Sequence, residues 1–268
     1  MVRLRKNKEK KHMAKLPNDY ELDFLKNCTK EELEPLVGAI LGTDDNGNID
    51  RSGRFSSELD NTPAFATHFP DHTKYVNEII EENQKYGGNT IANAWRGTGV
   101  SYHEVLCDAA DKMKVNFNSA QTTQTIEDQL LAKVLEDAWE KMSEDERKKL
   151  IDEAGNVFGA KVGGIGAGVL IQIIRMGGFK SYQIALIVAN AVAKAILGRG
   201  ISFAGNIYLT RVLAVLAGPI GWAITAVWTA FDFASQAYRV TIPACIYIAA
   251  LRKMKDNEKF AKDAETEE

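Results

Sequence analysis

The sequence predicts an all-α protein in which an acidic amphipathic helical half precedes a Gly/Ala-rich hydrophobic helical hairpin or bundle. Apolar residues recur three and four positions apart through residues 18–155, and no stretch there alternates long enough to form a strand. Several of these stretches begin with Ser, Thr or Asn followed three residues later by Glu, which is typical of a capping box. Charge is also segregated, because residues 17–161 carry fifteen basic and twenty-eight acidic side chains, whereas residues 162–251 carry six and one.

Length and composition limit the classes of protein further. A chain of 268 residues with 45% apolar residues can bury a sizeable core. Its three cysteines, Cys28, Cys107 and Cys245, are widely spaced and odd in number, which excludes a disulfide framework or zinc ribbon and favours a reducing compartment. The cysteines therefore indicate a cytoplasmic protein.

The pattern of charge, turn formers and hydropathy divides the chain into six predicted segments. These are a basic disordered tail (1–16), a small N-terminal helical module (17–41), a polar loop (42–63), a central helical domain (64–155), a hydrophobic helical region that is membrane-associated or a packed bundle (156–254), and a charged tail (255–268). The first tail carries seven basic side chains and one acidic one, and it lacks the apolar stretch of a secretory signal peptide. Such a run can also attract anionic lipid.

Helix starts are predicted from capping residues in chain order. In the N-terminal module, capping boxes at Asn18 and Thr29 open two short helices, and Pro35 is expected to bend the second. A helix over residues 72–86 ends at Gly87, which accepts the left-handed conformation of a helix terminus. Further starts are expected at Asn89, Ser101, Thr125 and Ser143.

The hydrophobic region leaves two interpretations open. Glycines four residues apart between positions 159 and 168 allow helices to approach closely in lipid. Val212–Phe231 is a charge-free run long enough to cross a bilayer core, but Gly218–Gly221 would break a helix near its middle. The run therefore forms either a membrane hairpin or re-entrant pair, or two helices buried in a soluble bundle. The residues expected to contact a membrane are Val215, Trp222, Ile224, Val227 and Trp228.

Constellations that carry catalysis are missing from the sequence. It has no Walker loop, no Gly-x-Ser-x-Gly elbow and no Cys-x-x-Cys pair. The pairs His68/His72 and His103/Cys107 are four residues apart, but two ligands do not make a metal site. We therefore predict no catalytic residue, no metal, no cofactor and no nucleic-acid partner.

Two motifs are more specific. The first is Gly87-Gly88-Asn89-Thr90-Ile91-Ala92-Asn93-x-x-Arg96-Gly97-x-Gly99-x-x-Tyr102-x-Glu104-Val105-Leu106-x-Asp108, and the second is Ala237-Tyr238-Arg239-Val240-Thr241-Ile242-Pro243-Ala244. Together with Asp19–Leu25, Ile126-Glu127-x-Gln129-Leu130-Leu131 and Leu251-Arg252-Lys253-Met254, they resemble the YaaW family of bacterial proteins over residues 16–255. The resemblance implies a small N-terminal helical module and a central region similar to the ubiquinol–cytochrome c chaperone domain, an all-helical assembly factor. It implies no catalytic residues.

The first motif has two physical interpretations. Arg96 and Glu104 can pair across the second glycine turn, either as part of a polar docking surface or as a structural corner. The residues expected to bind a partner are Asn89, Asn93, Arg96, Tyr102, Glu104, Tyr238 and Arg239. The residues expected to form turns or breaks are Gly87, Gly88, Gly97, Gly99, Pro219 and Pro243.

These observations favour a non-enzymatic, membrane-proximal protein-interaction or assembly-factor protein. It would be cytoplasmic and associated with the bacterial inner membrane, with a protein partner, an anionic membrane surface and its own copies as binding partners. Two alternatives remain: a pore-forming or membrane-disrupting helical protein, and an enzyme with an unrecognised site.

Overall fold

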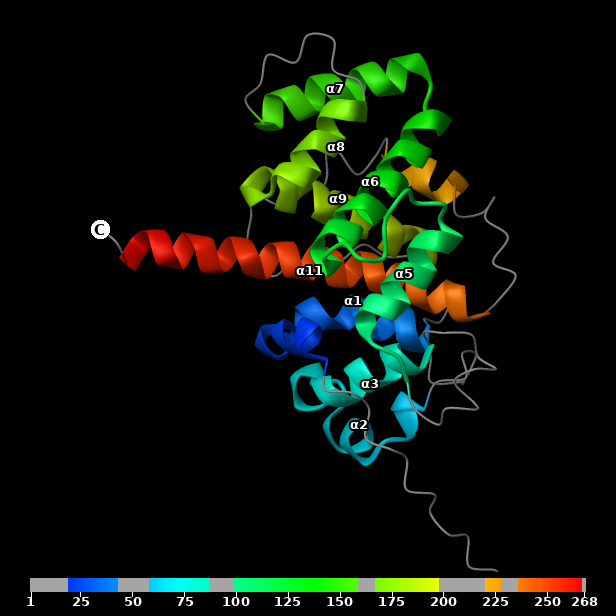
Figure 1. Cartoon of the computed structure of the whole chain (residues 1–268), viewed down its shortest axis with the longest axis vertical. Helices are drawn as coiled ribbons and strands as arrows, with labels where there is room; N and C mark the ends of the chain where they lie inside the picture. Colours follow the sequence, from blue (N-terminus) through cyan, green and yellow to red (C-terminus); the bar gives the residue numbers. More distant parts are fainter. Residues whose placement is uncertain are drawn as a thin grey trace, which may run out of the picture.

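The computed structural model describes residues 19–42, 58–86, 99–158, 167–197, 220–227 and 236–266. These residues form helices and connecting turns without a strand, which confirms the predicted all-α class. Figure 1 shows α11 crossing the middle of the molecule, with α1, α2 and α3 on one side of it and α6 to α9 on the other.

The helix bounds follow the chain from the N-terminal module to the long last helix. They are η1 (Tyr20–Asn27), α1 (Lys30–Leu41), η2 (Leu59–Asn61), α2 (Pro63–His68), η3 (His72–Lys74), α3 (Val76–Tyr86), α5 (Tyr102–Lys112), α6 (Thr123–Lys141), α7 (Glu144–Phe158), α8 (Ala167–Met176), α9 (Gly178–Leu197), a short helix at 220–227, and α11 (Gln236–Thr266).

Local capping signals identify several helix starts correctly. Thr29 and Glu32 form the predicted reciprocal capping box at α1. Ser143 Oγ accepts the Glu146 amide at 3.4 Å, while the Glu146 carboxylate accepts the Ser143 amide at 2.8 Å. At α5, the Ser101 side chain accepts the backbone amide of Glu104. These caps satisfy amides that a helix start leaves without an intrahelical partner.

Other predicted boundaries differ from the structure. The first helix is a 3₁₀ helix capped by Asp19. The long helix α6 begins at Thr123 with Thr122 as its cap, because Thr122 rather than Thr125 has the extended backbone of a capping residue. The predicted helix 72–86 is interrupted at Tyr75, so that η3 and α3 replace it. Part of the predicted loop 42–63 is η2, and the helix start predicted at Asn89 lies outside the described residues.

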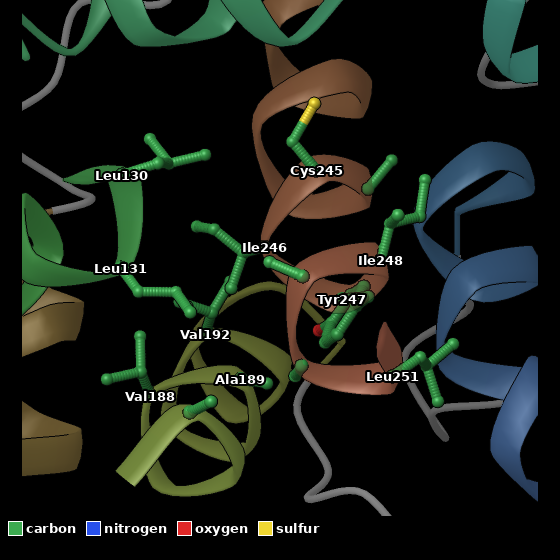
Figure 2. Close-up of a cluster of buried hydrophobic side chains, with 14 of the residues drawn as sticks. Leu130, Leu131, Val188, Ala189, Val192, Cys245, Ile246, Tyr247, Ile248 and Leu251 are labelled. Carbon is green, nitrogen blue, oxygen red and sulfur yellow. The ribbon is translucent and has the colours of Figure 1, made fainter. Parts of the chain in front are cut away.

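The core is centred on one stretch of α9 and one of α11 that are buried on every side. Every residue from Ser181 to Ala193 of α9 and from Val240 to Arg252 of α11 is buried. Figure 2 shows side chains of α6, α9 and α11 meeting there, among them Leu131, Val192 and Ile246. The α11 helix also packs against α1 and α5, so the N-terminal module shares this core.

Two further sequence predictions concern the segment boundaries and the hydrophobic run. The α7 helix runs through the predicted boundary at residue 155, and α11 runs through the one at residue 254, so the division into segments stays a prediction. Only residues 220–227 of the hydrophobic run 212–231 are described. Among the described residues, no helix is both long and apolar enough to cross a membrane.

Candidate functional site

The most distinctive polar feature is a buried network around Glu127 of α6. Its side chain is only 2% exposed, and both of its carboxylate oxygens accept hydrogen bonds. Tyr102 of α5 donates its hydroxyl to Oε1 at 2.8 Å. Arg252 of α11 donates Nε to Oε2 at 2.8 Å and Nη2 to Oε1 at 3.1 Å. We call Tyr102, Glu127 and Arg252 the Glu127 network; it joins three helices.

The Arg252 guanidinium extends the network to a fourth element. Its Nη1 donates to the backbone carbonyl of Glu21 in η1 at 2.8 Å. The same guanidinium lies over the ring of Phe24, 4.5 Å from the ring centroid, which is a cation–π geometry. Arg252 is therefore positioned both by its fork of donors and by its flat face.

Burial dominates the electrostatics of this network. It raises the pKa of Glu127, and the Arg252 cation and the Tyr102 hydroxyl oppose that rise. Burial also disfavours the Arg252 cation, but the Glu127 carboxylate outweighs this and raises the pKa of Arg252. The Tyr102 pKa is raised well above its ordinary value by burial and by the nearby Glu127 carboxylate. The network therefore holds an ion pair whose two charges depend on each other.

A second set of hydrogen bonds lies beside the network at the start of α6. Thr123 donates its hydroxyl to the Glu21 carboxylate at 2.7 Å. The two ring nitrogens of His103 lie 2.9 Å from Thr123 Oγ1 and 2.9 Å from the Ser119 carbonyl. Both ring nitrogens of His103 thus contact protein groups, and they do not face a metal site shared with Cys107. No group of residues suited to a metal ion occurs in the described part of the chain.

Residues after Arg252 fasten α11 to more of the bundle. Lys253 Nζ lies 2.7 Å from the Asp128 carboxylate and donates to the Ile174 carbonyl at 3.2 Å, which joins α11 to α6 and α8. Lys255 Nζ lies 2.8 Å from Glu32 of α1. One turn of α11 therefore binds four surrounding elements through its charged side chains.

The residues predicted to bind a partner fall in different environments. Tyr102 is fully buried, and its hydroxyl bonds to Glu127. Glu104 and Arg239 are exposed, on α5 and α11 respectively. The Tyr238 ring is half-buried, with Lys112 Nζ 5.4 Å from its centroid. Asn89, Asn93 and Arg96 lie outside the described residues, and so does the predicted Arg96–Glu104 pair.

The predicted turn and membrane residues are likewise divided. Pro243 is buried inside α11. Gly99 is described, in a segment outside the helices, and Gly87, Gly88, Gly97 and Pro219 are outside the described residues. In the helix at 220–227, Ile224 is 0% and Val227 6% exposed, whereas Trp222 is 43% exposed. Val215 and Trp228 are outside the described residues.

Glu127 and Arg252 were missed as site residues by reasoning from the sequence, although a signal for each is present. Glu127 stands between Ile126 and Leu130 on the apolar face of its helix, where a carboxylate is out of place. Arg252 directly follows an apolar run that ends at Leu251. A charge on an apolar face predicts a buried partner, but the sequence does not say which residue that partner is.

Comparison with known proteins gives matches over most of this chain. Residues 81–246 match the family model described as "Ubiquinol-cytochrome C chaperone". A UPF0174 protein of Helicobacter pylori (strain J99 / ATCC 700824) is 46% identical over 236 residues, which is 87% of this chain and 91% of that protein. The UPF0174 protein YaaW of Escherichia coli (strain K12) is 30% identical over 248 residues, or 88% and 95% of the two chains. No solved structure gives a significant match.

The helical fold and the chaperone family match together define a chaperone-like all-α protein. Within that class the chain belongs to the UPF0174 family, as the two motifs around Gly87 and Tyr238 predict. The chain and its relatives correspond over nearly their whole lengths.

Proposed function

We propose that this protein is a non-enzymatic assembly factor that binds another polypeptide at the cytoplasmic side of a bacterial inner membrane. The observation that carries this proposal is that the polar groups of the Glu127 network bond within the protein. Its charged and hydroxyl groups bond to one another and to backbone, and their burial leaves no open face for a substrate. The chaperone description of the matching family supports a binding role.

The partner is proposed to contact the exposed motif residues on α5 and α11. Glu104 and Arg239 carry opposite charges, and both are exposed on helices that pack against each other. Lys112 of α5 lies with its Nζ 5.4 Å from the centroid of the Tyr238 ring, so the same two helices also bring a cation and an aromatic ring together next to Arg239. A surface with both charges and an aromatic ring suits a polypeptide with polar and aromatic side chains.

Site-specific photocrosslinking in living cells tests this surface. A photoreactive residue at position 239 or 104 is expected to capture one discrete protein, whereas the exposed control positions Lys114 and Lys148 are not. Arg239→Glu should abolish capture from position 104. Deleting the chain should then lower the amount of the complex that contains the captured protein, as seen on native gels. Equal capture at all four positions, or an unchanged complex, would contradict the proposal.

Membrane association is a separable part of the proposal. It is supported by the basic excess of residues 162–251 and by the exposed Trp222 ring. Because Ile224 and Val227 are buried, replacing them would disturb the core, so Trp222→Ser is the cleaner variant. Wild-type chain is expected in the membrane fraction after a high-salt wash, and Trp222→Ser should be partly released. Recovery of all of the wild-type chain outside the membrane fraction would contradict membrane association.

One observation favours the pore-forming alternative. The α9 helix and the first half of α11 are apolar helices that amphipathic helices enclose. Such apolar helices tolerate a lipid environment as well as a protein core. Dye release from anionic vesicles distinguishes the two functions. An assembly factor is expected to release no more dye than a buffer control, and concentration-dependent release would favour the pore.

A further inference from the structure

An exposed corner connects α8 to α9. Gly177 and Gly178 have φ angles of +71° and +73°, and no atom lies within 4 Å of the position that a Cβ would occupy on either residue. Met176 is 81% exposed and Phe179 46% exposed. Arg175 and Lys180 flank them and are also exposed. We call residues 175–180 the glycine corner; it presents two apolar side chains between two cations.

The end of α11 is exposed at the same edge of the molecule. Lys253 donates to the carbonyl of Ile174, which places the end of α8 against α11 just before that helix leaves the bundle. Figure 1 shows the last turns of α11 projecting beyond the other helices. Phe260 there is 76% exposed. We call residues 256–263 the α11 tail.

The corner and the tail have opposite charge. The glycine corner carries two basic residues and no acidic one, whereas the α11 tail carries three acidic and two basic residues, and three further acidic residues follow it in the sequence. An anionic bilayer that approached the corner would also meet the acidic tail, which it repels. The tail of another chain would bring acidic groups and an exposed aromatic ring to the corner, which matches both its charge and its apolar side chains.

We propose that the glycine corner and the α11 tail form the interface of a two-fold symmetric dimer of this chain. Phe260 of each copy packs on Met176 and Phe179 of the other, while the acidic groups of the tail face Arg175 and Lys180. A two-fold axis makes this contact twice, because corner meets tail and tail meets corner. The dimer goes beyond the proposed function, since it does not use the surface around Glu104 and Arg239.

Mixed disulfide trapping tests the geometry of this contact. Full-length chains with Cys107→Ser form the background, because the other two cysteines are buried. One chain carries Met176→Cys and the other Phe260→Cys. Mixing them under mild oxidation is expected to give a covalent dimer at least ten times faster than either chain alone. Equal rates in all three samples would overturn the proposal.

Charge reversal tests the electrostatics. Light scattering of the wild type at tens of micromolar is expected to give a dimer mass. Arg175→Glu/Lys180→Glu should raise the dissociation constant at least tenfold, and adding Asp256→Lys/Asp263→Lys should restore it. Trp222→Ser, which changes an exposed aromatic residue on another helix, should remain dimeric.

A wild-type chain that stays monomeric would overturn this interface. If that monomer sediments with anionic vesicles and Met176→Ser/Phe179→Ser does not, the corner binds a membrane instead. Circular dichroism confirms that each variant is folded.

Discussion

A carboxylate at position 127 is destabilising by itself, because burial removes it from water and raises its pKa. The two hydrogen bonds from Arg252 and the one from Tyr102 compensate that cost. Such a pair adds little net stability compared with apolar residues, but it is costly to break. The Glu127 network instead fixes the positions of three helices, since α5, α6 and α11 must be aligned before all three side chains can bond.

Removing one partner from this network should therefore be severe. Glu127→Ala leaves the Arg252 guanidinium buried without its carboxylate, and we expect the free energy of unfolding to fall by about 3–5 kcal/mol. Urea titration at pH 7 measures this. Glu136→Ala on the exposed side of the same helix is the control and should change the value by less than about 0.5 kcal/mol. If Glu127→Ala were as mild as the control, the ion pair would have no structural role.

His72 supplies a pH dependence that is independent of the Glu127 network. Its ring is 1% exposed, with Nδ1 hydrogen-bonded to the Tyr75 hydroxyl, and burial lowers the pKa of His72 from 6.5 to about 4. The unfolded chain therefore binds the proton more readily. The stability this group contributes is complete above about pH 6.5 and is lost as the pH falls towards 4, by up to about 3 kcal/mol.

Urea unfolding at pH 7, 5.5 and 4.5 checks this dependence. His72→Gln removes the titrating ring, so we expect a flatter pH profile together with lower stability at pH 7. His68→Gln alters an exposed histidine in the neighbouring helix and should keep the wild-type slope. A wild-type slope in His72→Gln would assign the acid sensitivity to other groups.

At the scale of elements, the predictions that succeeded depend on short-range chemistry. The Thr29 and Ser143 capping boxes each need only four consecutive residues, so the sequence alone identifies them. Asp19 is different, because its carboxylate also accepts the backbone amide of Tyr102 and the side-chain amide of Gln84. Contacts between distant segments thus set the start of η1, and a local pattern does not contain them.

The candidate site follows the same division. The two motifs predict the family correctly, but Tyr102, which they include among the partner-binding residues, is a buried donor to Glu127. Glu127 and Arg252 are separated by 125 residues, and only the packing of α6 on α11 brings them together. Periodicity shows that a residue faces a core; it does not identify what it meets there.

The glycine corner permits a matched test of backbone conformation. Gly177→Ala places a Cβ in open space but at positive φ, so its cost is purely conformational, about 1–2 kcal/mol. Gly168→Ala also meets no atom within 4 Å, but it lies in α8 without positive φ and should stabilise by up to about 1 kcal/mol. Thermal melts should shift in opposite directions. A Gly177→Ala variant that melts at or above the temperature of the wild type would mean that a side chain does not strain the corner conformation.

At the scale of the whole molecule, α11 connects elements from both ends of the chain. Its buried half lies in the common core with α9, and the turn after it binds η1, α1, α6 and α8 through Arg252, Lys253 and Lys255. Hydropathy alone could not distinguish this helix from a membrane segment, because a core helix and a lipid-facing helix are both apolar all round. The charged turn at its end is the feature that relates it to the rest of the bundle.

Two truncations separate the core role of α11 from its projecting end. A chain ending at Glu258 keeps the contacts of Arg252, Lys253 and Lys255, so its free energy of unfolding should stay within about 1 kcal/mol of the full chain. It lacks Phe260 and most of the acidic tail, so light scattering should report a monomer. A chain ending at Leu251 leaves Glu127 buried without Arg252, and its free energy of unfolding should fall by at least about 3–5 kcal/mol. If both truncations melted alike, the projecting turns would stabilise the fold instead of the interface between copies.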